Sequence, residues 1–206
     1  MRKIFLALAF LIVSLLSFAQ EHIEFKGIPL NGSSMSFASK LKAKGYEQVY
    51  HSNFDYVLKG QFTGKEATVY VLGTRSSGTV WKVVAQLPEE DSWAHLKSDY
   101  NKYVELFTQK YGTPSDHFEF FSTPYYEGDG YELQALKNDK CTYSTYFKTE
   151  KGTLNVAITS SGNLSLGYED KINTEIQTEE KNNADLNIED YEILINCFGI
   201  TDNNDV

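Results

Sequence analysis

Apolar residues follow two helical patterns along the chain. Between residues 93 and 111 they recur at steps of three and four, which predicts a long amphipathic helix with Gly112 as its stop. A shorter pattern predicts a helix from Ser33 or Ser34 to about Lys44, with the serine as its cap. Each helix has one apolar side, so each needs a surface to pack against.

Segments rich in Val, Tyr, Phe and Trp, bounded by turn residues, predict antiparallel strands. Before the long helix they span residues 54–62, 67–72 and 79–87, and after it residues 117–121, 131–137, 141–148, 153–159 and 163–168. We therefore predict an α+β fold with helices packed on one face of one or more antiparallel sheets. The turns and alternation of QFTGKEATVYVLGTRSSGTVWKV resemble those of YFKTEKGTLNVAITSSGNLSLGY. This favours tandem helix-plus-four-strand units, and chance similarity between hairpins is the alternative.

The first 19 residues have the pattern of a signal peptide. A basic start is followed by an apolar run of about 13 residues and by small residues before a cleavage point between Ala19 and Gln20. The run is too short to span a bilayer, so we expect no stable membrane anchor after cleavage and a periplasmic or secreted protein. The rest divides into a first unit (20–88), a second unit (89–172) and a C-terminal part (173–206).

Negative charge gathers near the C-terminus. The chain has a net charge of −9 at pH 7, and residues 169–206 hold eleven acidic residues against two lysines. The preceding body is nearly neutral, so we expect no nucleic-acid partner. The acidic stretch NTEIQTEEKNNADLN has no aromatic residue and predicts a disordered linker, which a short apolar segment follows.

Few residues suggest catalytic or metal chemistry. The loop GIPLNGSS lacks the lysine of a phosphate-binding loop, so we interpret it as a turn and a helix cap. The four histidines form no metal-binding pattern, and we expect neither a metal nor a cofactor. Cys141 and Cys197 could form a disulfide in an oxidising compartment, or be two unrelated buried thiols.

The segment TPYYEGDGYE is the best candidate for binding. Tyr125, Tyr126 and Tyr131 flank Asp129 and two glycines, and tyrosines on a loop suit contact with a protein or a carbohydrate. The alternative is that these rings only cover a sheet edge. We therefore expect a non-catalytic exported binding module. A small secreted hydrolase with catalytic residues dispersed along the sequence is the second hypothesis.

The pattern FKGIPLNGS…F…L…KGY, followed by a W-x-x-L helix ending in KYGTP and by GTLNVAI…LGYEDKIN, resembles a family of small uncharacterised exported bacterial proteins. The resemblance covers the chain from the predicted cleavage point to about Asn173. It implies export, and the family has no assigned activity that it could imply for this chain. In outline, the predicted architecture is also similar to the β-lactamase-inhibitor-protein-like fold of secreted inhibitors. That likeness concerns architecture and does not imply a function.

Overall fold

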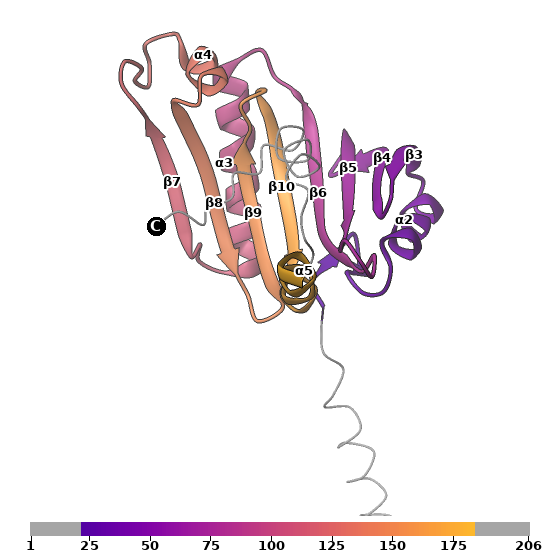
Figure 1. Ribbon diagram of the computed structural model, residues 1–206. Coiled ribbons are helices and arrows are strands. Elements are labelled where there is room, and N and C mark those ends of the chain that lie inside the picture. The colour runs from indigo at the N-terminus through magenta and orange to yellow at the C-terminus, as the bar shows by residue number, and fades with distance from the viewer. Residues whose placement is uncertain (1–21, 184–206) are drawn as a thin grey trace, which may run out of the picture.

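The structure, a computed structural model, describes residues 22–183, which form one large antiparallel sheet with helices packed against it (Figure 1). The eight strands lie in the order β3–β4–β5–β6–β10–β9–β8–β7. They are β3 (Glu47–Ser52), β4 (Asp55–Phe62), β5 (Lys65–Gly73), β6 (Val80–Glu89), β7 (Asp116–Phe121), β8 (Cys141–Lys148), β9 (Gly152–Ile158) and β10 (Asn163–Asp170). A hairpin precedes them, β1 (Glu24–Phe25) and β2 (Ile28–Pro29). The helices of this part are α2 (Ser34–Ala43), α3 (Trp93–Tyr111), α4 (Glu132–Lys137) and α5 (Lys171–Asn183).

The element order confirms the predicted α+β class. α2 precedes β3 to β6, and α3 precedes β7 to β10, so each half of the sheet has four strands. The halves meet where β6 pairs antiparallel with β10. The units predicted at residues 20–88 and 89–172 thus contribute to one continuous sheet. The residues predicted to form the signal peptide and its cleavage point, Ala19 and Gln20 included, lie outside the described residues.

Two local predictions were wrong. Residues 131–137 were expected to form a strand, but residues 132–137 form α4. Glu, Leu, Gln and Ala are strong helix formers and none is β-branched, which explains the helix. The strand β3 was missed because its residues are mostly exposed and have no alternating apolar pattern.

One face of the sheet, called here the inner face, holds the core. Leu58, Val69, Ala85, Leu166 and Val156 lie directly opposite one another across five adjacent strands and are fully buried. Opposite residues share a face, so these side chains form one row. α2 packs over β3, β4 and β5, and α3 over β8, β9 and β10. The other face of the sheet is called the outer face below.

The loop GIPLNGSS is a turn and a helix cap, as predicted. The Ser33 hydroxyl accepts a hydrogen bond from the Ser36 N–H at 3.2 Å and caps α2. The neighbouring Ser34 N–H donates to the Gly78 carbonyl at 2.9 Å. The loop therefore begins α2 and joins it to the β5–β6 turn.

The C-terminal helix corrects the predicted disordered linker. Residues 171–183 form α5, which packs chiefly against β6 at the lower end of the sheet in Figure 1. Its hydrogen bonds to the body come from polar side chains. The Gln177 Oε1 accepts from the Arg75 N–H at 3.3 Å, and the Glu180 carboxylate accepts from the N–H groups of Ser76 and Ser77. A helix that docks through polar side chains has no apolar stripe, so its sequence resembles a linker.

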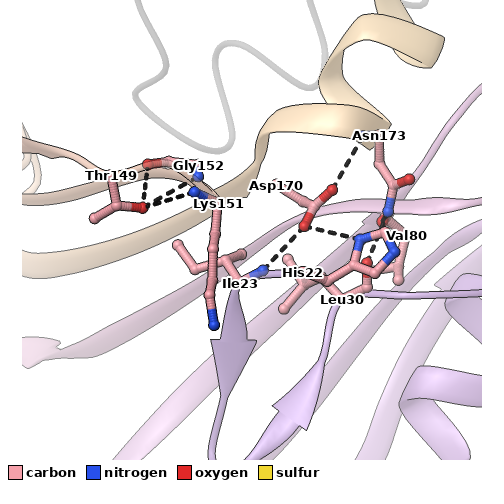
Figure 2. A network of polar contacts seen from close by, with 9 residues as sticks. All are labelled: His22, Ile23, Leu30, Val80, Thr149, Lys151, Gly152, Asp170 and Asn173. Carbon is pink, nitrogen blue, oxygen red and sulfur yellow. Dashed lines mark hydrogen bonds and ion pairs between the residues drawn. The ribbon is translucent and has the colours of Figure 1, made fainter. Parts of the chain in front are cut away.

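A buried polar network holds the start of α5 (Figure 2). Asp170 is fully buried, and its carboxylate accepts from the Ile23 N–H at 3.0 Å and from the Asn173 N–H at 3.1 Å. His22 Nδ1 lies 3.0 Å from the same carboxylate. The Asn173 side-chain amide donates to the carbonyls of Leu30 and Val80 at 2.7 and 2.8 Å. The network ties the first described residues, the central strand β6 and α5 together.

Candidate functional site

The predicted tyrosine loop follows β7 and is organised by one carboxylate. Asp129 Oδ2 accepts from the Tyr126 N–H at 3.0 Å, and Oδ1 accepts from the Tyr131 N–H at 2.7 Å. The same carboxyl group thus fixes the backbone at both exposed tyrosines. Because each of its oxygens accepts one N–H of the loop, Asp129 holds the loop in position.

Further contacts join the loop to the body of the protein. The Gly128 N–H donates to the Glu132 carboxylate of α4 at 2.9 Å. Glu127 forms an ion pair with Lys97 of α3 and accepts from the Tyr143 hydroxyl of β8 at 3.4 Å. The loop therefore contacts α3, α4 and β8, and it presents its outer side chains from a fixed frame.

The tyrosines of the loop differ in exposure. The side chains of Tyr126 and Tyr131 are 65% and 60% exposed. Tyr125 is half-buried, and its hydroxyl accepts a hydrogen bond from the Asn138 amide at 2.8 Å. The structure thus places two of the predicted binding residues on the surface, while Tyr125 supports the loop from within.

β7 adds two exposed rings that the sequence reasoning missed. Phe118 and Phe120 are 42% and 49% exposed and lie opposite Ser144 and Thr142, on the outer face. The alternation in DHFEFF was the available signal, because it places an aromatic ring at every second position of the strand. Phe118, Phe120, Tyr126 and Tyr131 are called the aromatic surface below. They are four of the nine large hydrophobic side chains that are exposed within residues 22–183.

A cluster of packed rings lies on the inner face where β7 ends. The Trp93 ring meets the rings of Phe121 and Tyr143 edge to face, with centroids 5.6 and 5.0 Å apart. Tyr143 also meets Tyr100 edge to face at 5.5 Å. Edge-to-face pairs of this kind stabilise a fixed arrangement, so Phe121 at the C-terminal end of β7 is held against Trp93 of α3.

Cys141 lies beside this cluster at the start of β8 and is half-buried. Burial, with Glu127 and Glu132 nearby, raises the pKa of its thiol to about 12. The thiolate is the reactive form of cysteine, so Cys141 is a poor nucleophile at neutral pH. Its predicted disulfide partner Cys197 lies outside the described residues.

The histidines form no accessible triad in the described part of the chain. His117 Nε2 lies 3.3 Å from the Glu119 carboxylate, and His117 Nδ1 lies 2.8 Å from the Thr145 hydroxyl. Thr145 is fully buried and also bonds to the Tyr100 hydroxyl at 2.6 Å, so this hydroxyl cannot reach a substrate. His51 and His95 are exposed on the surface. His22 belongs to the buried network around Asp170.

The described residues contain neither a metal-binding cluster nor a membrane-spanning helix. Residues 22–183 contain no group of three or more His, Cys, Asp or Glu side chains that could hold a metal ion. No helix among them is long and apolar enough to cross a membrane.

A shallow groove of about 230 Å³ lies between β4, β5, β6 and β10, lined by Lys59, Glu66, Gln86 and Asn163 among others. Its lining contains no aromatic ring and has one lysine and one glutamate as its charged residues, so the aromatic surface remains the stronger candidate.

Comparison with protein-family models, curated proteins and solved structures finds no match. The resemblances noted from the sequence therefore stay expectations, and the site is interpreted from its own geometry.

Proposed function

We propose that this chain is an exported, non-catalytic binding module that contacts a protein partner through the aromatic surface. One observation carries the proposal: Phe118, Phe120, Tyr126 and Tyr131 are exposed on one strand and on the hydrogen-bonded loop that directly follows it. Rings held in place lose little conformational entropy on binding, and tyrosine is enriched where interfaces gain most of their affinity.

The composition of the surface favours a protein over a glycan. A glycan site pairs aromatic rings with polar groups that are free to bond sugar hydroxyls. Here each oxygen of the Asp129 carboxylate already accepts one backbone N–H of the loop, and Phe118 and Phe120 have no polar atoms in their side chains. Two apolar and two amphipathic rings suit the centre of a protein interface.

Export is part of the proposal and rests on the sequence of residues 1–19. The repeated order of a helix and four strands supports an origin from two tandem units. The hydrolase hypothesis is the weaker one, since the only described histidine bonded to both a carboxylate and a hydroxyl contacts a buried hydroxyl.

Affinity capture from the cell envelope and medium tests the proposal. The tagged protein is compared with a Tyr126→Ser/Tyr131→Ser variant and with Tyr50→Ser, a matched control at the opposite edge of the sheet whose ring is also 60% exposed. Loss of a central interface tyrosine costs about 2 kcal/mol, or roughly thirtyfold in affinity. We expect one stoichiometric protein partner that the double variant loses and the control keeps. A partner retained equally by all three proteins would contradict the proposal.

A further inference from the structure

The outer edge of β7 presents hydrogen-bonding groups of the backbone. The Ser122 N–H donates to the Lys140 carbonyl at 2.8 Å and continues the register of β7 on β8. Bonded and non-bonded pairs alternate along antiparallel strands, so the even-numbered residues of β7 bond to β8. The N–H and C=O groups of His117 and Glu119 therefore point outward. In the described part of the chain, no strand pairs with this edge.

The two edges of the sheet differ in their protection. β3 has a register shift between Gln48 and Tyr50, and such bulges prevent edge-to-edge pairing. β7 keeps an unbroken register over its six residues and contains no lysine or proline. The helix α3 packs over β8, β9 and β10, and β7 lies beyond it at the side of the sheet (Figure 1). A second strand could approach β7 without meeting the helix layer.

We infer that β7 pairs antiparallel with β7 of a second copy, around a two-fold axis that passes through Phe118. In this register His117 lies opposite the partner subunit's Glu119, and Glu119 lies opposite the partner subunit's His117. His117 and Glu119 both have backbone N–H and C=O groups that point outward, so the pairing gives these groups hydrogen-bond partners. Each imidazole also meets a carboxylate on the inner face, and the two Phe118 rings meet on the outer face.

Other registers are less favourable. Directly opposite residues must share a face, so the two-fold axis has to pass through a residue of the strand. An axis at Glu119 would place two carboxylates opposite each other, and an axis at His117 would place two imidazoles together. An axis at Phe120 would leave His117 beyond the paired residues. The match of an imidazole with a carboxylate therefore selects the axis at Phe118.

The pairing would join two outer faces edge to edge and bring the Phe118 rings of the two copies together, while the loops that carry Tyr126 and Tyr131 would lie at opposite ends of the paired strands. The inference rests on the edge of β7 and not on the proposed function. A monomer that still captures its partner through Tyr126 and Tyr131 would overturn only the pairing. A dimer without a captured partner would overturn only the function.

Disulfide trapping tests the pairing and its register. In a Cys141→Ser/Cys197→Ser background, Phe118→Cys would place two thiols across the axis in a non-bonded pair, where Cα atoms lie about 4.5 Å apart. That separation is within the range of disulfides. Phe120→Cys is the matched control, because residue 120 is similarly exposed but lies opposite Asp116. We expect Phe118→Cys to form a covalent dimer at micromolar concentration on a non-reducing gel, and Phe120→Cys to form none although its strands still pair. Equal cross-linking, or none at residue 118, would overturn the inference.

Charge reversal gives a second, non-covalent test by sedimentation. In His117→Glu, the new carboxylate of each copy would face Glu119 of the other copy. This should raise the dissociation constant of the dimer about tenfold. Adding Glu119→Lys restores opposite charges and should recover the affinity to within about threefold. His51→Glu on the β3 edge is the control and should leave the dimer unchanged. A wild-type chain that is monomeric at every concentration would refute the pairing.

Discussion

The buried amide of Asn173 offers a direct test of how α5 is held. Asn173→Ala removes the hydrogen bonds to the carbonyls of Leu30 and Val80, and the Asn173 side chain is only 3% exposed. A buried carbonyl left without a donor costs about 1–3 kcal/mol. The two carbonyls together should lower the free energy of unfolding by about 3 kcal/mol.

The neighbouring residue provides a matched control. Thr174 has a buried hydroxyl without a hydrogen-bond partner in the described structure. Thr174→Ala removes that unsatisfied group and adds a better helix former, so its effect should be neutral or slightly stabilising. Both substitutions shorten a polar side chain at the first turns of α5, and only one of them breaks a bond.

Thermal and urea denaturation measure the difference. For a domain of this size, 3 kcal/mol corresponds to a fall in Tm of roughly 6–12 °C. If α5 detaches before the sheet unfolds, hydrogen exchange should instead rise in residues 22–30 and 171–182 alone. The reasoning is refuted if Asn173→Ala matches Thr174→Ala in both the denaturation and the exchange measurements.

Three further predictions follow from single side chains. In the reduced, folded protein, Cys141 should react with iodoacetamide at pH 8 at least a hundredfold more slowly than in urea, as peptide mapping would show. Burial raises the pKa of Glu180, but hydrogen bonds from the β5–β6 turn outweigh it and hold the pKa below its ordinary value of 4.5. The stabilisation that this lowered pKa provides is lost as pH falls below 4.5. On acidification, the urea midpoint of Glu180→Gln should therefore fall less than that of the wild-type protein. Gly152→Ala should cost roughly 3 kcal/mol or more in chemical denaturation, since its Cβ would lie 2.0 Å from the Glu169 carbonyl oxygen. Gly64→Ala, with open space around it, should cost only about 1 kcal/mol.

The sequence predicted the parts of the fold whose packing is apolar and local. The helix at residues 93–111 was predicted with its correct ends because its apolar stripe and Gly112 are both local signals. The pairing of β6 with β10 could not be predicted, since it joins residues about eighty positions apart by backbone bonds that have no side-chain pattern. α5 was missed for a related reason. Asn173, Gln177 and Glu180 bond to backbone groups, and such contacts look like ordinary surface polarity in a sequence.

The candidate site was predicted in part for similar reasons. Tyr126 and Tyr131 were found because two glycines and an aspartate mark a loop between them. The supporting role of Asp129 depends on which N–H groups its carboxylate meets, and that is a property of the folded loop. Phe118 and Phe120 were overlooked because an aromatic residue in a strand is usually assigned to the core. Only the folded structure shows that the outer face of this strand is uncovered.

The contrast between the two sheet edges argues that the exposure of β7 has a use. A bulge interrupts β3. β7 has no such protection, and Phe118 and Phe120 occupy positions where a solvated face would ordinarily have polar residues. Exposed rings on an unprotected edge promote non-specific association between protein molecules. Their presence is therefore best explained by a specific contact. A contact through the backbone edge requires one register and is tested at Phe118, whereas a contact through the loop rings is tested at Tyr126 and Tyr131. Since neither tyrosine belongs to β7, the two contacts can be removed separately.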